Sequence, residues 1–358
     1  MFISALGSIS GKSNRLGLAR ASKALVILVD GLGADNLRAA GGHAPFLNAA
    51  LSRSKSINTV FPSTTAAAIT SFGVGAPPSA HGVFGYSVWD RENLVTRNLL
   101  TGWTADFAPE KFQSMPSVSE MAKQLGIRSF TVGPGEYAES GFTRLNMAAA
   151  EYVPARSFDD RMDSVKNILS TKQDSITYLY FPELDSLAHS HGVASMEWLN
   201  KLEELDQAIK TLVVNLPNGV GVLVTADHGI VDVSRADQFL LDELAIPGLI
   251  SVTGDPRNSF LYFEPGIDLA RQKSLLAEAL GESFVVATPH ELQSKGWLEK
   301  SIENEAFLPD IFVISVGKNA CYHRKFAKPQ SLRMIGQHGG ISQTELSVPF
   351  LKFGVYAT

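Results

Sequence analysis

Five aspartate and histidine side chains, grouped in three short stretches, are of the residue types that bind metal ions. In "ELDSLAHSHG", Asp185 and His189 are four residues apart, so they share one face if this stretch is helical. In "TADHG", Asp227 and His228 are adjacent, and in "GQHGG" the glycines around His338 let the backbone approach closely. Carboxylate oxygens and imidazole nitrogens are both ligands of zinc. These stretches therefore predict metal binding.

The strands expected in this sequence end beside such polar residues. The apolar run "KALVILVD" (23–30), which ends at Asp30, is typical of a strand buried on both faces. Further strands, expected at 55–60, 176–181 and 221–225, lead to Thr64 and Thr65, to Asp185, and to Asp227 and His228. Ligands of open α/β sheets bind outside the carboxyl ends of the strands. We therefore expect these side chains at one sheet edge, in numbers that suffice for two metal sites of three protein ligands each. Such a pair can clamp both oxygens of a phosphoryl transfer.

Each of these features also has a simpler explanation. Asp30 could end a strand in a turn, Asp185 could cap a helix, and a single histidine is commonly packed or solvated. The hydroxyls of "STT" in "FPSTTAAAITS" (61–71) stand at a predicted helix start, where they could cap the helix or supply a nucleophile. The meeting of several such residues at one sheet edge favours the metal site.

The rest of the chain predicts an α/β fold with a largely parallel sheet between helices. Strand and helix patterns alternate to about residue 245, and 195–216 is a long amphipathic helix. The pattern then changes to a smaller α+β unit. We predict a catalytic α/β domain made of 23–249 and 331–358, a 250–330 insertion that could cap the site, and an N-terminal tail, 1–22, that is either loose or packed on the body.

Composition limits the classes of partner and compartment. The chain has 358 residues, 45% of them hydrophobic, and a net charge of −5, which provides no basic surplus for nucleic acid or anionic membranes. Cys321 is the single cysteine, so an internal disulfide is excluded and a reducing compartment is favoured. No apolar run approaches the length of a membrane span. We expect a soluble cytoplasmic protein that acts on a small molecule, with its oligomeric state open.

One motif is rejected. "VDGLGADN" begins like a dinucleotide-binding fingerprint after a strand, but the third glycine would fall at Asn36. Asp30 would also crowd a pyrophosphate unless a cation screened it. A nicotinamide or flavin cofactor is therefore not expected.

Five stretches resemble the type I phosphodiesterase/nucleotide pyrophosphatase family of the alkaline phosphatase superfamily: "LVDGLGADN", "FPSTTAAAITSFGVGAPPSAHGVFGY", "FPELDSLAHSHG", "VTADHG" and "GQHGGISQTELSVPF". The resemblance covers roughly 23–245 and 334–353 and implies an alkaline phosphatase-like fold. It also implies two zinc ions, one held by Asp185, His189 and His338 and the other by Asp30, Asp227, His228 and the nucleophile's oxygen. The family nucleophile lies three residues after a proline at a helix start, which is Thr65 after Pro62.

The resemblance implies hydrolysis of phosphodiesters or nucleotide pyrophosphates through a phosphothreonine. Where the family has an asparagine for a phosphate oxygen, this chain has Tyr86, which could donate its hydroxyl or be core, with Ser87 or Arg91 in its place. Arg257, Tyr262 and His323 are further candidate contacts from the insertion. Two alternatives stay open: a phosphomonoesterase or phosphomutase of the same superfamily, and a metal-binding protein with an inactive site.

Overall fold

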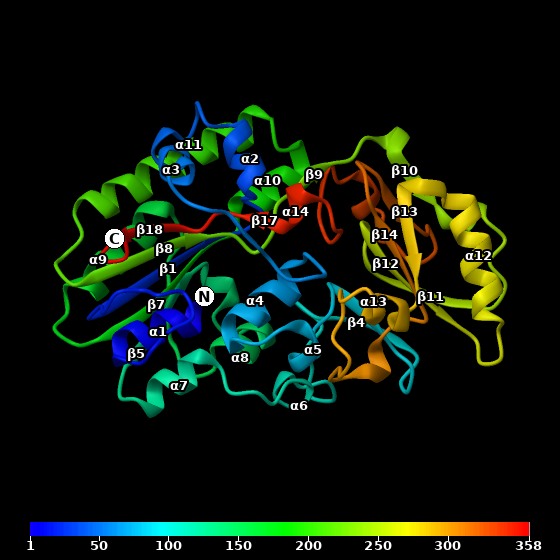
Figure 1. The fold of residues 1–358 in the computed structure, drawn as a ribbon, viewed down its shortest axis with the longest axis horizontal. Helices are drawn as coiled ribbons and strands as arrows, with labels where there is room; N and C mark the ends of the chain where they lie inside the picture. The colour runs from blue at the N-terminus through cyan, green and yellow to red at the C-terminus, as the bar shows by residue number, and fades with distance from the viewer. Residues whose placement is uncertain (358) are drawn as a thin grey trace.

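The computed structural model describes residues 1–357, and its largest element is a six-stranded, mostly parallel sheet (Figure 1). The strand order is β18-β8-β1-β7-β5-β6, and only the edge strand β18 runs antiparallel. The strands are β1 (Lys23–Val29), β5 (Arg128–Gly133), β6 (Glu151–Pro154), β7 (Ser175–Phe181), β8 (Val220–Thr225) and β18 (Leu351–Gly354).

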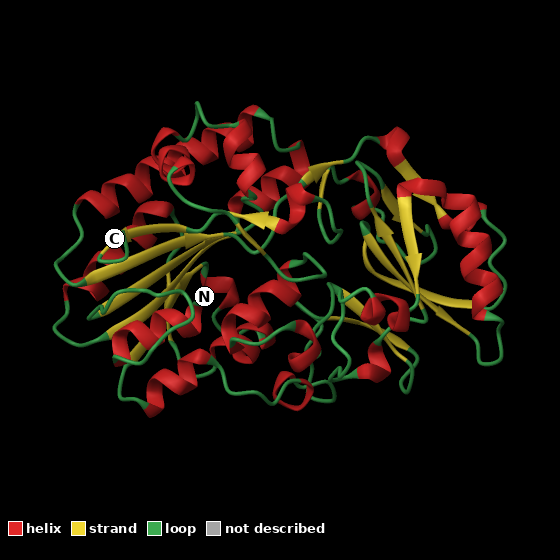
Figure 2. Ribbon diagram, in the orientation of Figure 1, coloured by secondary structure: helices red, strands yellow, loops and turns green. Residues whose placement is uncertain are grey.

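Helices cover both faces of this sheet, as Figure 2 shows. One layer contains α2 (Ala34–Ala39), α3 (Pro45–Ser52), α9 (Phe158–Ser170), α10 (Glu183–His191) and α11 (Met196–Val214). The other contains α1 (Phe2–Ser10), α4 (Thr65–Val74), α7 (Val118–Gln124) and α8 (Gly141–Met147). Alternate side chains of β1 enter the two cores, with Leu25 and Ile27 on one side and Val26 and Leu28 on the other. The unbroken apolar run of β1 follows from this double burial.

The N-terminal segment packs on the body. The ring of Phe2 in α1 stacks on Phe72 of α4 at a centroid distance of 4.7 Å, and Leu6 and Ile9 are buried in the same core. Of the two arrangements that the sequence left open for 1–22, the packed one is therefore present over α1. Within residues 1–357, no helix combines the length and apolarity that crossing a membrane requires.

A second, antiparallel sheet has the strand order β11-β12-β14-β13. Its strands are β11 (Leu249–Asp255), β12 (Asn258–Phe263), β13 (Phe284–Ala287) and β14 (Ile311–Ser315), and α12 (Leu269–Leu280) packs on one face. The other face packs on Phe84, Val88 and Leu99, which lie between β1 and β5 along the chain. Helix α13 (Pro289–Ser294) joins that contact through Leu292. The division into domains at 249 and 330 stays a prediction.

Shorter elements connect these layers. They are β2 (Ile57–Asn58), α5 (Pro78–His81), β3 (Ser87–Asp90), β4 (Val95–Asn98), α6 (Pro109–Phe112), β9 (Val231–Asp232), β10 (Gln238–Leu240), β15 (Ala320–Tyr322), β16 (Gly336–Gln337), α14 (Gln343–Leu346) and β17 (Ser347–Val348). Strand β10 pairs with β15, β9 with β16, and β2 with β17.

The strand predicted at 55–60 is wrong. Only Ile57 and Asn58 form a strand, β2, and it pairs with β17 outside the large sheet. The stretch "SINTV" mixes polar and apolar residues, and Ile57 is only half-buried, so the segment does not have the continuous apolar surface of a central strand. Thr64 and Thr65 therefore reach the sheet edge on a loop rather than at a strand end.

Candidate metal and nucleophile site

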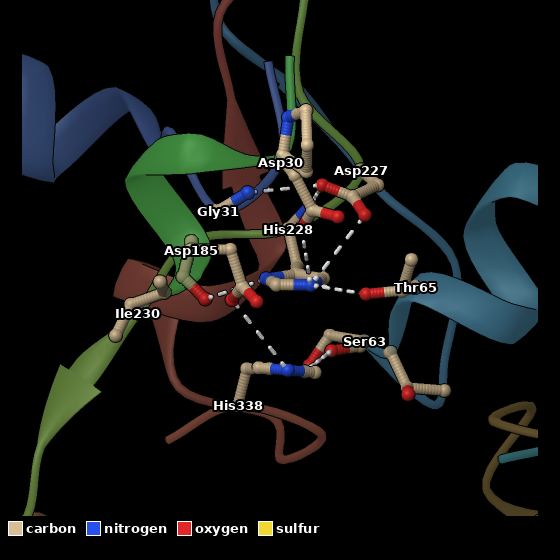
Figure 3. A network of polar contacts seen from close by, with 12 residues as sticks. Asp30, Gly31, Ser63, Thr65, Asp185, Asp227, His228, Ile230 and His338 are labelled. Carbon is tan, nitrogen blue, oxygen red and sulfur yellow. Dashed lines mark hydrogen bonds and ion pairs between the residues drawn. The ribbon is translucent and has the colours of Figure 1, made fainter. Parts of the chain in front are cut away.

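Four of the candidate site residues follow the carboxyl ends of three neighbouring parallel strands (Figure 3). Val29 at the end of β1 is paired with Phe181 at the end of β7, and Leu28 is paired with Thr225 at the end of β8. The three strands thus stop at the same level. Their next residues lead to Asp30 after β1, to Asp185 in the first turn of α10 after β7, and to Asp227 and His228 after β8.

His338 and Thr65 come from other parts of the chain. Strand β16 pairs with β9, which follows His228, and this pairing stacks the His338 ring on the His228 ring at 3.6 Å. Gly339 has a φ of 113° and a Cβ there would lie 2.8 Å from the Cβ of Asp255, so the backbone after His338 requires glycine. Thr65 is the first residue of α4, and its Oγ1 lies 3.0 Å from His228 Nε2.

The ligand atoms fall into two groups. Asp185, His189 and His338 form one, and Asp30, Asp227 and His228 form the other. Within each group, one nitrogen or oxygen of every member lies within 4.8 Å of the others. The structure thus brings together the two sets that the resemblance implies. The spacing of Asp185 and His189 acts as expected on α10, where Oδ2 and Nε2 are 3.2 Å apart.

Backbone carbonyls orient all three histidines. The acceptors are the carbonyls of Gly229 for His228, Gly336 for His189 and Ser63 for His338, at 3.2, 2.6 and 3.2 Å from Nδ1. A carbonyl can only accept, so Nδ1 carries a proton in each ring, which leaves Nε2 as the ring atom available to a metal ion. Each Nε2 lies near a site carboxylate. This is the arrangement of metal-binding histidines.

Each of the three aspartates has one buried oxygen without a hydrogen-bond partner among the described residues. These atoms are Asp30 Oδ1, Asp185 Oδ1 and Asp227 Oδ2. Other oxygens are held by the protein: Tyr180 donates its hydroxyl to Asp30 Oδ2 at 2.5 Å, and Gly31 donates its N–H to Asp227 Oδ1 at 3.1 Å. A buried carboxylate oxygen needs a partner. The donor set and the free oxygens therefore fit divalent metal ions.

The pKa shifts of the site residues also indicate that the buried carboxylates require nearby positive charge. Burial raises the pKa of Asp30 well above its usual value, and the nearby Asp227 and Asp185 raise it further. Burial opposes ionisation of Asp185 too, but the His189 imidazole holds the pKa of Asp185 below its usual range. Burial lowers the pKa of His189, but the nearby Asp185 carboxylate outweighs this effect and raises the pKa to about 9. Crowded carboxylates thus depend on neighbouring positive charge.

Thr64 occupies the N-cap position of α4 but does not cap it. Its Oγ1 donates instead to Asp255 Oδ1 at 3.1 Å, and no described side chain serves as the N-cap acceptor of α4. Of the hydroxyls of "STT", the one at the N-cap position therefore does not cap the helix, because its Oγ1 bonds to the Asp255 carboxylate and accepts no first-turn N–H. The first-turn N–H groups of α4 lie next to Thr65 and can bind an anion.

A cavity of about 920 Å³ opens beside Thr65 and the first metal-binding group. Tyr86 and His323 line it, as expected for substrate contacts. Arg91 does not line it, because it follows the β3 strand and pairs with Asp310 at 2.9 Å. Tyr262, predicted as a contact, is buried and donates its hydroxyl to the Phe307 carbonyl.

Sequence reasoning missed Asp255, which also lines this cavity. Its second oxygen, Oδ2, accepts the backbone N–H of Tyr86 at 3.3 Å. Burial raises the pKa of Asp255 to about 6. The only sequence signal is "GDP", which resembles an ordinary turn between two strands, so nothing there indicates a position beside Thr64.

Arg257 is a structural residue rather than a substrate contact. It and Glu345 are fully buried, and two hydrogen bonds of 2.7 Å join their side chains. Glu345 Oε1 also accepts the N–H of Gly340 at 2.8 Å. This pair links the second sheet to the loop that carries His338.

Comparisons with known proteins agree with this geometry. The family model for type I phosphodiesterase / nucleotide pyrophosphatase matches residues 24–340. Human ectonucleotide pyrophosphatase/phosphodiesterase family member 1 is 26% identical over 219 residues, which are 57% of this chain but only 23% of that protein. The chain thus matches less than a quarter of the length of this relative.

Solved structures show the same fold. The murine ectonucleotide pyrophosphatase/phosphodiesterase 5 has a TM-score of 0.72 at 18% identity, over 93% of this chain and 88% of that chain. An inactive threonine-to-alanine variant of the murine protein in complex with AMP has a TM-score of 0.73 at 18% identity, with the same coverage. The human counterpart has 0.72 at 16% identity, again over 93% and 88%. The predicted alkaline phosphatase-like fold is confirmed.

The buried pair provides a test of how the His338 loop is held. Glu345→Gln should lower the free energy of unfolding by about 3 kcal/mol, because it leaves the Arg257 guanidinium buried without its counter-charge. Urea denaturation would measure the change. As a matched control, Asp35→Asn removes an exposed pair with Arg38 and should cost less than about 1 kcal/mol. Equal effects of the two substitutions would contradict the structural role of Glu345.

Proposed function

Since this chain belongs to the type I phosphodiesterase/nucleotide pyrophosphatase family, we propose that it hydrolyses phosphodiesters or nucleotide pyrophosphates, with Thr65 as the nucleophile at a two-zinc centre. One observation carries this proposal. The two groups of candidate metal ligands meet through the stacked rings of His228 and His338, and His228 Nε2 lies 3.0 Å from the Thr65 hydroxyl. Such a set of ligands with a neighbouring hydroxyl suits nucleophilic phosphoryl transfer.

The residues that would hold the metals are the two groups described above, with the Thr65 oxygen added to the group of Asp30, Asp227 and His228. Imidazole ligands favour zinc over magnesium. When bound, two such ions supply positive charge that acidifies a hydroxyl and stabilises the oxygens of a transferring phosphoryl group.

The chain's own residues define the rest of the reaction. Thr65 Oγ1 attacks phosphorus, the bond from phosphorus to the leaving oxygen breaks, and the leaving oxygen departs as a hydroxyl with the proton that Thr65 loses, which leaves a phosphothreonine. Water then attacks that phosphorus, the bond to Oγ1 breaks, and the hydroxyl is restored. The first-turn N–H groups of α4 are placed to bind the phosphate oxygens in both steps. The hydrogen bond between Thr65 and His228 orients the free hydroxyl.

The cavity supports a diester or nucleotide as the substrate class. Its lining combines Tyr86, Phe326 and Met334 with small polar residues, which suits a flat organic group. Among the lining residues of the described chain, Lys328 is the only lysine or arginine, so the cavity offers little positive charge for the second negative charge of a phosphomonoester. The AMP bound by the murine relative is a nucleoside monophosphate, which supports a nucleoside group as part of the substrate, and the inactive threonine variant supports a nucleophilic role for Thr65.

The metal content provides a first prediction. Purified protein should contain close to two zinc ions per chain, and His338→Ala should lose about one, because it removes one of three ligands from one group. Elemental analysis by mass spectrometry would measure both. The control is His191→Ala, which removes an exposed histidine of the same α10 helix as His189 and should leave the metal content unchanged. A single magnesium ion in the unaltered protein would reject the scheme.

The nucleophile provides a second prediction. Thr65→Ala should lower kcat at least about 1,000-fold, because no other oxygen can form the phosphothreonine. Metal content and melting temperature should change little. Thr65→Ser keeps a hydroxyl at the same place and should retain measurable turnover. Steady-state assays with bis(p-nitrophenyl) phosphate would test this. Full activity in Thr65→Ala would assign the attack to another group.

The substrate class provides a third prediction. At equal metal content, kcat/KM should be about tenfold or more higher for bis(p-nitrophenyl) phosphate than for p-nitrophenyl phosphate, since a dianion requires more positive charge than this cavity provides. The two esters share a leaving group, so their ratio reports on the phosphate. A tenfold preference for the monoester would favour the phosphomonoesterase alternative.

A further inference from the structure

Asp255 extends the site from a part of the molecule that contains none of the metal-binding residues. It is the last residue of β11 in the second sheet and is 6% exposed, yet it lines the same cavity as Thr65. Its two oxygens accept hydrogen bonds from the Thr64 hydroxyl and the Tyr86 N–H. Thr64 directly precedes the proposed nucleophile. The carboxylate is therefore held in a defined position beside the place where a substrate phosphate would bind.

No cation forms an ion pair with Asp255 within residues 1–357, and His228 and His189 act on it only through space. Both hydrogen-bond donors are uncharged, and no lysine, arginine or histidine nitrogen forms an ion pair with it. The nearest arginine in sequence, Arg257, is already bound to both oxygens of Glu345. Lys328, the only lysine or arginine among the described lining residues, is exposed and lies on the segment after β15. The charge of Asp255 therefore acts on whatever occupies the cavity.

The charge balance of the site depends on this carboxylate. Two divalent ions bring four positive charges, and the ligand carboxylates of Asp30, Asp185 and Asp227 offset three of them. Asp255 adds a fourth negative charge. Its repulsion of a bound phosphate is proportional to the charge of that phosphate, so a dianion is disfavoured about twice as strongly as a monoanion.

We propose that Asp255 is the specificity-determining residue that makes the site prefer monoanionic phosphodiesters over dianionic phosphomonoesters. This inference rests on the proposed function, because it assumes that phosphate binds between Thr65 and the metal groups. It assigns to the second sheet a direct role in substrate choice. The role is electrostatic, and it differs from the positioning of Thr64 that the same hydrogen bond provides.

The test compares Asp255→Asn with the unaltered protein at about pH 8.5, where the monoester is a dianion and Asp255 is ionised. The ratio of kcat/KM for bis(p-nitrophenyl) phosphate to that for p-nitrophenyl phosphate should fall about tenfold, mainly through a gain on the monoester. Inorganic phosphate, also a dianion, should bind about tenfold more tightly in calorimetric titrations. The titration requires no turnover.

Thr64→Val separates charge from positioning. It removes the hydrogen bond to Asp255 but keeps the carboxylate, so it should lower both activities alike and leave their ratio unchanged. A second variant, Asp255→Ala, removes the charge without a new amide to accommodate and should change the ratio and phosphate binding in the same direction as Asp255→Asn. Melting temperatures would show that each variant is folded.

The outcomes distinguish this inference from the function on which it rests. An unchanged ratio and unchanged phosphate affinity in both Asp255 variants, with Thr65 still essential, would overturn the role of Asp255 alone. A shift of the ratio in Thr64→Val as large as that in Asp255→Asn would also overturn it, because positioning would then explain the effect. Turnover that survives Thr65→Ala would instead reject the proposed function, and tighter phosphate binding in the Asp255 variants would still support the electrostatic role.

Discussion

The repulsion among buried carboxylates at one edge of the large sheet is the constraint on which this structure depends. Asp30, Asp185 and Asp227 each have a buried oxygen without a protein partner, and their mutual charge raises the pKa of Asp30 well above its usual value after burial has already raised it. An arrangement of this kind is unfavourable unless cations complete it. The rest of the fold holds the carboxylates close together in spite of that repulsion.

Neighbouring strands and hydrogen bonds fix the positions of these carboxylates. Strands β8, β1 and β7 lie side by side and end at the same level, so the three carboxylates start from fixed positions. Asn36 donates to the carbonyl of Ile230 and accepts its N–H, both at 3.0 Å, which ties the loop after His228 to α2. The residue that breaks the dinucleotide fingerprint therefore has a structural role at the same site.

The second sheet completes the site rather than only covering it. Its Arg257 is bound to Glu345, which also holds the loop after His338, and its Asp255 is bound to Thr64. An apolar contact that includes Phe84 and Phe260 joins the second sheet to the segments that follow α4. A change in the second sheet can therefore reach both the His338 loop and the start of α4 through short, direct contacts.

The sequence by itself determined the candidate ligand residues and the parallel sheet. A helix repeats every 3.6 residues, which places Asp185 and His189 on one face, and buried parallel strands require the continuous apolar runs found before Asp30 and Asp227. These are local properties of the chain. The short β2, the placement of Arg91 against Asp310 and the approach of Asp255 to Thr64 were decided only by the tertiary structure. Each of them depends on a contact between residues far apart in the chain, and local periodicity contains no information about which distant partner will provide the packing surface or the counter-charge.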